Sequence, residues 1–479
     1  MMSLLVTTVY MLIAVATVVH VLLDNRQPAK TMAWVLVIMF VPVVGIGLYL
    51  FFGVNTRRER LISQRSLDQL TKRSMLGYVE QHDLQLPATY RPVIDLFVNQ
   101  SMSLPFKDNR FTIHTSGHQF FTALLAAIGS ARSHIHLDIY IFDDDALGQL
   151  VADALVDKAR QGVEVRIIYD DVGCWNVRRS FFERLREEGI EVVPFLPVRF
   201  PTFTRKVNYR NHRKLIVIDG TTGFIGGMNI ALRYVKGRRH GSPAHQPWRD
   251  TMLQVSGPVV WSMQRTFLVD WYFVDRTQLS DRKYYPKSAA DAAYPGGALA
   301  QVVTSGPNSP YPEIMQGFVR IILAARRYIY IETPYFLPTE PVLFALKTAA
   351  VAGIDVRLLV PLHGDAHFTE WAGRSYLREA LDAGVRVSLY DAGFLHSKLM
   401  VVDDALSTCG STNVDFRSFE NNFEANIFIY DQPTAASVRQ LFLDDEQHAV
   451  ALASLPRRCN PSFAVRLCES FCRLLAPLM

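Results

Sequence analysis

Alternating apolar and amphipathic segments predict the elements of an α/β unit in residues 111–280. Short apolar runs indicate strands, and segments with apolar residues every three or four positions indicate helices. The order strand, helix, strand, helix, strand is expected at residues 134–142, 146–161, 163–169, 180–188 and 190–195. Gly189 is expected to end the second of these helices. Such alternation is typical of a sheet covered by helices.

The same order of elements recurs in residues 301–450. The matching segments are residues 328–331, 341–351, 354–360, 376–383 and 385–390. Gly353 and Gly384 stand where Gly162 and Gly189 stand in the first unit. Self-similarity at an offset that drifts only slightly indicates an internal duplication. The pattern therefore predicts an α/β fold of two tandem sandwich domains related by a pseudo-twofold axis.

Two long apolar stretches precede these units, at residues 3–23 and 31–52. A helix of about 20 residues reaches across the ~30 Å hydrocarbon core of a bilayer. Pro42 interrupts the second stretch, but transmembrane helices tolerate proline. Because only the short polar sequence DNRQPAK separates the stretches, residues 1–55 are expected to form a two-helix transmembrane hairpin.

The distribution of basic residues around the hairpin predicts its orientation. The second stretch is followed by Arg57, Arg58, Arg60 and Arg65, whereas the loop between the stretches holds only Arg26 and Lys30. The positive-inside bias therefore places the rest of the chain on the cytoplasmic side. An alternative is a cleaved signal peptide with a site at residues 14–16, although no basic residue precedes its apolar region.

The remaining segments are shorter. Residues 56–110 are mixed and polar, and we expect a connector that packs on the first domain. Residues 281–300 have the proline, glycine, alanine and lysine content of a linker. Residues 451–479 form an amphipathic tail, whose apolar stripe comprises Phe463, Leu467, Phe471, Leu474, Leu475 and Leu478. This stripe fits either a helix at a membrane interface or a helix docked on the protein.

The overall charge of the chain excludes few classes of function by itself. Charged residues make up 20% of the chain, and its net charge of +5 is too small to indicate nucleic-acid binding. The balance does suit an anionic surface. The five cysteines show no metal-binding spacing, so reduced thiols are expected.

One motif occurs twice, once in each unit. In the first copy, NHRKLIVIDGTTGFIGGMN, the spaced residues are His212, Lys214, Asp219 and Asn229. In the second copy, FLHSKLMVVDDALSTCGSTN, the residues at the same intervals are His396, Lys398, Asp403 and Asn413. A single copy would be a weak signal among 13 histidines. Two copies with matching glycine and asparagine positions indicate a functional site.

If residues 212–218 form a strand, the spacing of the motif has a chemical explanation, because alternate side chains of a strand share a face. His212 and Lys214 would point the same way, one as nucleophile or proton carrier and the other as a fixed charge for a phosphate oxygen. The glycines allow close approach of an anion, and Asn229 adds neutral donors. Asp219 and Asp403, beyond the strands, are expected to have a structural hydrogen-bonding role instead of a chemical one.

The paired motifs resemble those of the phospholipase D superfamily. The resemblance extends to IHLDIYIFDDDALGQLVADALVDKARQGVEVRIIYDDVG, VVTSGPNSPYPEIMQGF, YIETPYFLPTEPVL and the apolar hairpin, and over nearly the whole chain it is to the bacterial cardiolipin synthase family. It implies two phospholipase D-like domains with one composite site, a location in the bacterial inner membrane as a multi-pass protein, and an activity that needs no metal or cofactor.

The resemblance also implies roles for the motif residues. His212 would attack the phosphorus of phosphatidylglycerol to give a phosphatidyl-histidine, and His396 would act as acid and then base. Transfer to a second phosphatidylglycerol would yield cardiolipin and glycerol. Lys214, Lys398, Asn229 and Asn413 would hold the phosphoryl oxygens.

Each histidine also needs a carboxylate on its far ring nitrogen. Asp250 follows the first motif and Glu424 the second, both at the start of strand-like runs that could return beside the motif of their own unit. Glu420 competes with Glu424 for this role. Both candidates resemble the acidic partners of the family.

Two other functions remain open from the sequence. A hydrolytic phospholipase D or another phosphodiesterase would carry the same motifs, and a non-catalytic membrane scaffold would bind phospholipid without turnover. Basic residues flank the first motif and are expected to attract anionic headgroups; they are Arg205, Lys206, Arg210, Lys236, Arg238 and Arg239. Anionic phospholipid, rather than nucleic acid, is thus the expected partner.

Overall fold

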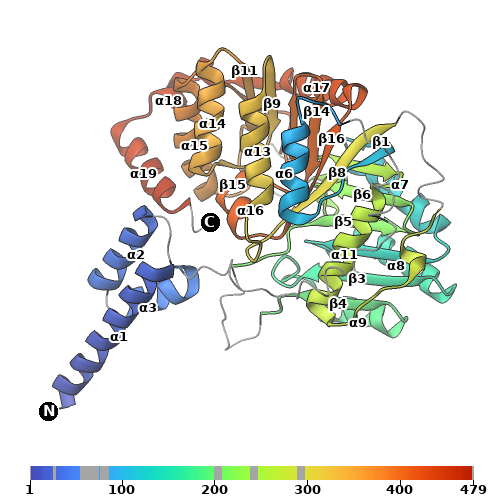
Figure 1. Ribbon diagram of the computed structural model, residues 1–479, viewed down its shortest axis with the longest axis horizontal. Coiled ribbons are helices and arrows are strands. Elements are labelled where there is room, and N and C mark those ends of the chain that lie inside the picture. Colours follow the sequence, from blue (N-terminus) through green and yellow to red (C-terminus); the bar gives the residue numbers. More distant parts are fainter. Residues whose placement is uncertain are drawn as a thin grey trace.

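Two α/β repeats share one continuous sheet of 15 strands (Figure 1). The structure is a computed structural model that describes residues 2–24, 28–41, 43–53, 75, 86–198, 208–237, 246–287 and 297–476. The strand order is β17-β12-β11-β9-β13-β14-β16-β8-β1-β7-β6-β5-β2-β3-β4. The α/β class and the tandem arrangement are therefore confirmed.

The first repeat supplies seven strands of this sheet. They are β1 (Phe106–His114), β2 (His134–Ile139), β3 (Glu164–Asp170), β4 (Glu191–Phe195), β5 (Lys214–Ile218), β6 (Thr222–Gly226) and β7 (Met252–Ser256). Its helices are α7 (Gly117–Ser130), α8 (Ala146–Arg160), α9 (Arg179–Glu187), α10 (Arg233–Lys236) and α11 (Val260–Asp275), and the 3-10 helix η3 (Arg282–Tyr284) follows.

The second repeat copies this order. Its strands are β8 (Ala298–Ser305), β9 (Tyr328–Glu332), β11 (Asp355–Pro361), β12 (Arg386–Tyr390), β13 (Leu399–Val402), β14 (Leu406–Gly410), β16 (Glu424–Tyr430) and β17 (Ala449–Ala451), with β10 (Phe336–Leu337) and β15 (Val414–Asp415) as a separate pair. Its helices are α13 (Glu313–Ala324), α14 (Glu340–Val351), α15 (His367–Asp382), α16 (Phe416–Glu420) and α17 (Gln432–Glu446). The 3-10 helix η4 (Leu452–Ser454), α18 (Pro456–Cys459) and α19 (Phe463–Leu474) end the described chain.

Apart from β17, which is added at one edge, the sheet order reads the same from both ends, and this is the pseudo-twofold relation. Strands β2, β3 and β4 are parallel neighbours, as are β9, β11 and β12. The two copies meet where β1 and β8 pair antiparallel, with Phe106 opposite Ala300. By this order β5 corresponds to β13, and β7 corresponds to β16.

A buried apolar cluster joins the two halves of the sheet. It contains Leu215 and Ile225 from the first repeat and Leu399 and Ile427 from the second. Helices α11 and α17 also contribute side chains to it. Each repeat also has a cluster of its own beneath its outer helices. The outer helices thus cover the outer faces, while α11, α17 and the opposite repeat cover the inner faces.

The motif aspartates fasten the turn after each motif strand. Asp219 accepts hydrogen bonds from the backbone N–H groups of Arg132 (2.8 Å), Ser133 (2.7 Å) and His134 (2.9 Å). Asp403 accepts the equivalent bonds from Arg326, Arg327 and Tyr328 in the second repeat. Both aspartates have positive φ, 52° and 56°. Their expected structural role agrees with these contacts, which tie β5 to β2 and β13 to β9.

The amino-terminal helices differ from the expected hairpin. They are α1 (Met2–Asp24), α2 (Pro28–Phe40), α3 (Val44–Leu48) and the π-helix η1 (Tyr49–Gly53). The expected second span is divided, and α2 with its 13 residues is about 20 Å long, shorter than a hydrocarbon core. Within the described residues, no helix combines the length and apolar character needed to cross a membrane. The arginines after the second stretch lie outside the described residues.

The connector prediction is wrong in one respect. Helix α6 (Arg91–Ser101) lies within residues 56–110 and packs on the second repeat instead of the first. The ring of Phe97 packs in a tilted arrangement against that of Phe428 of β16, with ring centroids 4.6 Å apart. A side chain on Gly317 of α13 would collide with the Phe97 ring. The chain therefore crosses the second repeat before it enters the first.

Candidate active site

Both motif histidines lie in extended segments just before strands, not within them as expected. His212 precedes β5 and His396 precedes β13. Each backbone N–H donates to a carbonyl of the other repeat: His212 to Phe423 (2.9 Å) and His396 to Arg249 (2.7 Å). These contacts hold each histidine in place through the opposite repeat.

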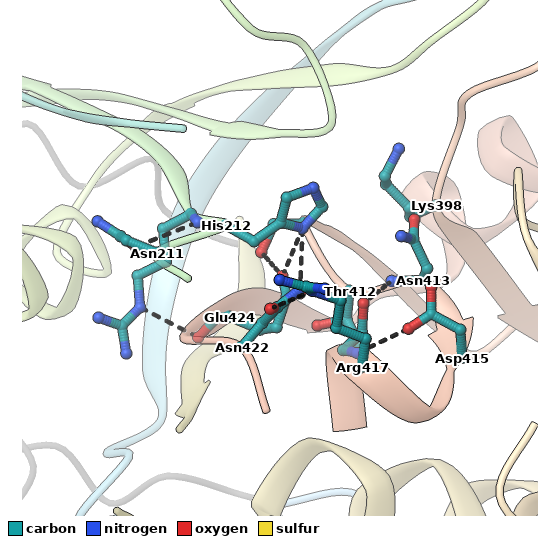
Figure 2. Close-up of polar contacts among 12 residues, drawn as sticks. Asn211, His212, Lys398, Thr412, Asn413, Asp415, Arg417, Asn422 and Glu424 are labelled. Carbon is teal, nitrogen blue, oxygen red and sulfur yellow. Dashed lines mark hydrogen bonds and ion pairs between the residues drawn. The ribbon is translucent and has the colours of Figure 1, made fainter. Parts of the chain in front are cut away.

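The imidazole of His212 is oriented by Glu424. The Nδ1 atom lies 3.0 Å from Oε1 and 3.1 Å from Oε2 of this carboxylate. Figure 2 shows the ring above Glu424, with its second nitrogen directed away from the carboxylate. Ser411 and Asn422 each donate a hydrogen bond to Glu424. The carboxylate is therefore fixed on several sides, and the Nε2 atom of His212 is left for chemistry.

The imidazole of His396 is oriented in the same way by Asp250. The distance from Nδ1 to Oδ2 is 2.6 Å. Lys398 Nζ also lies 2.9 Å from this Nδ1 and 3.9 Å from the same carboxylate oxygen. Because the carboxylate is ionised, Nδ1 of His396 carries the proton and donates it, so Nε2 holds the free lone pair.

The carboxylates are exchanged between the repeats. Asp250 belongs to the first repeat but serves His396, and Glu424 belongs to the second but serves His212. The expectation that each would return to the motif of its own unit is wrong. Strands β7 and β16 lie on either side of the central β1 and β8, and Asp250, two residues before β7, and Glu424, the first residue of β16, both reach the histidine of the other repeat. Glu420 ends α16, and Glu424 contacts the histidine in its place.

Burial sets the protonation of the site. It lowers the pKa of His212 to about 4 and that of His396 to about 3, so both are neutral near pH 7. Burial alone would raise the pKa of Glu424, but His212 and Lys214 outweigh it and hold that pKa below its ordinary value. Lys398 and His396 do the same for the pKa of Asp250. Both carboxylates are therefore ionised.

The two motif lysines lie beneath the histidines. Lys214 Nζ donates to the carbonyl oxygen of His212 (2.6 Å), and Lys398 Nζ donates to that of His396. Their exposed fractions are 1% and 3%. Desolvation lowers the pKa of both ammonium groups. The charges of the two buried carboxylates offset those of the two ammonium groups beside them.

One cavity of about 290 Å³ exposes both histidines. Asn229 and Asn413, the residues predicted to bind phosphate, also line it. The amide of Asn229 is held, accepting from the backbone N–H of Ile141 (3.1 Å) and donating to the hydroxyl of Tyr234 (3.1 Å). The motif residues that reach the cavity are therefore the histidines and asparagines, with the lysines behind them.

Several lining residues were not predicted from the sequence. The ring of Tyr140 lies 5.0 Å from that of His212, and Lys214 Nζ lies 5.0 Å from the same tyrosine ring. Trp248 lies 5.0 Å from the His396 ring. Trp248 stands two residues before Asp250, so alternation along an extended segment could have placed both on one face.

The basic residues expected around the site fall into three groups. Arg210 is buried and pairs with Asp170 at 3.5 Å, so it lines the cavity instead of forming an outer rim. Lys236 ends α10. Arg205, Lys206, Arg238 and Arg239 lie outside the described residues. Arg417, which was not predicted, lines the cavity and donates to Asn422 at 3.3 Å (Figure 2).

Comparison with known families agrees with this geometry. The family described as "Cardiolipin synthase, PLD-like domain" matches residues 124–239 and 318–445. A second family, "Phospholipase_D-nuclease N-terminal", matches residues 12–53.

Similar proteins span almost the whole chain. The sequence is 39% identical to "Cardiolipin synthase 2" of Bacillus anthracis over 466 residues, covering 96% of this chain and 88% of that protein. It is 35% identical to "Major cardiolipin synthase ClsA" of Bacillus subtilis, covering 100% and 99%. The crystal structure of phosphatidylserine synthase from Haemophilus influenzae Rd KW20 shares the fold, with a TM-score of 0.60, 16% identity and coverage of 82% and 100%.

We predict that acid weakens the folded protein partly through these histidines. Because the folded-state pKa of His212 is about 4, the unfolded chain binds a proton near pH 6.5 that the folded protein does not. The unfolding free energy should therefore fall as the pH drops from about 6.5 to about 4, by on the order of 3 kcal/mol from this residue. Denaturant titrations at several pH values should show a smaller fall for His212→Asn. The control His118→Asn, at an exposed position on α7, should behave as wild type. An unchanged fall in His212→Asn would contradict the prediction.

Proposed function

The chain belongs to the cardiolipin synthase family of phospholipase D-like proteins and acts as a phosphatidyltransferase, and from this premise we propose a specific reaction. The phosphatidyl group of one phosphatidylglycerol is transferred to the headgroup hydroxyl of a second, which gives cardiolipin and glycerol. The observation that carries the proposal is the shared cavity, where two histidines each keep one ring nitrogen free while a buried carboxylate holds the other.

The first displacement forms a bond between His212 and phosphorus. The Nε2 lone pair of His212 attacks the phosphodiester, and the bond from phosphorus to the glycerol oxygen breaks. His396 donates its Nε2 proton to that leaving oxygen. His396 is neutral in the empty site, but a bound anionic phosphodiester favours its protonated form, because opposite charges nearby raise the pKa of an imidazole.

The second displacement returns both histidines to their starting state. Neutral His396 removes the proton from the hydroxyl of the incoming phosphatidylglycerol, whose oxygen attacks phosphorus. The phosphorus–nitrogen bond breaks and His212 regains its lone pair. Glu424 steadies the positive charge that His212 carries while it is phosphatidylated, and Asp250 does so for protonated His396.

Charge on the phosphoryl oxygens is balanced by residues at and beneath the cavity. Asn229 and Asn413 line it, and Arg417 adds a guanidinium. Lys214 and Lys398 contribute two buried positive charges close behind the histidines. Interactions of this kind are strong in a site of low dielectric, since few water dipoles compete.

Membrane attachment through the amino-terminal helices forms part of the proposal. Helix α1 exposes large apolar side chains along its length, with Leu5, Leu12 and Leu23 between 65% and 75% accessible. Continuous exposed apolar surface marks a site that meets lipid or protein. The excess of arginine after residue 53 supports an orientation with the catalytic repeats on the cytoplasmic face of a bacterial inner membrane.

The direct test supplies phosphatidylglycerol as the only lipid. Detergent-solubilised full-length protein should convert it to cardiolipin and free glycerol, measured by mass spectrometry. His212→Ala and His396→Ala should each lower the rate by at least about 10²-fold, because each removes a group that takes part in both displacements. His118→Ala, at an exposed position on α7, is the matched control and should retain wild-type activity. Phosphatidic acid as the sole product would instead identify a hydrolase.

A second test assigns the nucleophile. A phosphatidyl ester of 4-nitrophenol has a leaving group that departs without protonation, so His396→Ala should release about one equivalent of nitrophenolate and stop. Mass spectrometry of peptides prepared at alkaline pH should then find the phosphatidyl group on His212. His212→Ala should give neither release nor adduct. An adduct on His396 in the His212→Ala variant would exchange the two roles.

A further inference from the structure

Helix α19 packs on the protein through its polar side. The helix runs from Phe463 to Leu474 along α15, at the outer edge of the second repeat (Figure 1). Its buried side carries Glu469, which is 2% exposed, and Cys472. An amphipathic helix on a soluble protein ordinarily turns its apolar stripe to the core. This helix is turned the other way.

Ion pairs with α15 fix this orientation. Glu469 lies 2.5 Å from Arg378 and 4.0 Å from Arg374. Arg473 lies 2.6 Å from Glu379, and its guanidinium stacks over the ring of Tyr376 at 4.0 Å. Because Glu469 is buried among these partners, rotating the helix to hide its apolar stripe would leave charged groups of α15 and α19 without their partners.

The opposite side of α19 is a row of large apolar side chains in solvent. Phe463 is 82% exposed, Leu467 60%, Phe471 60% and Leu474 73%. These positions are three or four residues apart and form one stripe. Arg466, three residues after Phe463 on the same helix, is exposed at the margin of this stripe, and Arg457 of the preceding helix α18 is also exposed. An apolar stripe with basic residues at its margin is the pattern of helices that lie in an anionic lipid interface.

The helix also leads to the catalytic cavity. Ala476, two residues beyond α19, lines the cavity, as does Thr369 at the start of α15. Phe368, next to Thr369, is 41% exposed. The end of α19 and the start of α15 therefore both lie at the cavity, and Phe368 exposes an apolar side chain next to a lining residue. The acyl chains of a phospholipid substrate have to remain in lipid here while the headgroup enters.

We propose that α19 is an interfacial helix, which inserts Phe463, Leu467, Phe471 and Leu474 into the surface of an anionic phospholipid bilayer and so holds the mouth of the cavity against the lipid. The link to the cavity rests on the proposed phospholipid substrate. The choice of lipid over a second copy of the chain follows from Arg466 at the margin of the stripe and from the cavity, because a protein partner on this stripe would separate the cavity from the membrane.

A fluorescent label on the stripe tests lipid contact directly. The full-length chain carrying Leu467→Cys, with Cys459→Ser and Cys468→Ser, is labelled with bimane and reconstituted in vesicles that contain nitroxide lipids. The matched control places the label at Phe344→Cys on α14, which is 68% exposed. We expect several-fold stronger quenching at position 467 than at position 344, and stronger quenching with phosphatidylglycerol than with phosphatidylcholine alone. Equal quenching at both positions would overturn the proposal. A dimer detected by light scattering, with the stripe protected in its interface, would overturn it as well.

Activity measurements separate this proposal from the proposed reaction. Phe463→Ser/Leu467→Ser/Phe471→Ser should lower turnover of phosphatidylglycerol in vesicles by about tenfold, since apolar contact with the interface is lost. It should leave turnover of monomeric dihexanoyl phosphatidylglycerol unchanged. Phe344→Ser/Val351→Ser, on the exposed face of α14, should change neither rate. An equal loss of turnover on both substrates would contradict the interfacial role of α19. A wild-type protein inactive on both substrates would contradict the proposed reaction, and the quenching experiment alone would then test whether α19 contacts lipid.

Discussion

The crossed pairing of histidines with carboxylates is the interaction on which the site depends. Glu424 of the second repeat holds His212 of the first, and Asp250 of the first holds His396 of the second. Backbone hydrogen bonds from both histidines to the opposite repeat follow the same exchange. Neither repeat therefore contains a complete histidine–carboxylate pair of its own. The continuous sheet and the shared apolar cluster between the repeats are what bring each pair together.

Burial and charge act together in this arrangement. Desolvation keeps both histidines neutral and lowers the pKa of both lysines, while the carboxylates stay ionised beside them. Buried groups outside the cavity hold the backbone of the site in place. Arg213, between His212 and Lys214, pairs with Asp270 and donates a hydrogen bond to the carbonyl oxygen of Glu424. Arg249 pairs with Asp445 of the second repeat at 2.6 Å. An anionic phosphodiester entering the cavity would meet the amides of Asn229 and Asn413 and the buried lysines already held in position, which limits the reorganisation that the reaction requires.

Local patterns in the sequence were sufficient for the repeated elements and the motif. Helix α8 and strands β3 and β4 lie within a residue or so of their expected positions, because each alternates or repeats at the period of its own structure. The numerical domain limits remain a prediction. Helix α15 begins nine residues before its expected start at residue 376. The exchange of carboxylates between the repeats was not predicted, because sequence spacing carries no information about which half of the sheet a strand end faces. The orientation of α19 could not be predicted from the sequence pattern either. The pattern showed the apolar stripe, but the charged residues of α15 decide which side of the helix is buried.

A double-mutant cycle measures the crossed pairing most directly. Unfolding free energies of wild type, His212→Asn, Glu424→Gln and the double variant give the coupling between this histidine and this carboxylate. The account predicts coupling of about 1 kcal/mol or more for His212 with Glu424, as expected for residues in direct contact. The corresponding cycle of His396 with Glu424, two residues of the same repeat, should give coupling near zero. Coupling confined to His396 and Glu424 would contradict a site assembled by exchange between the repeats.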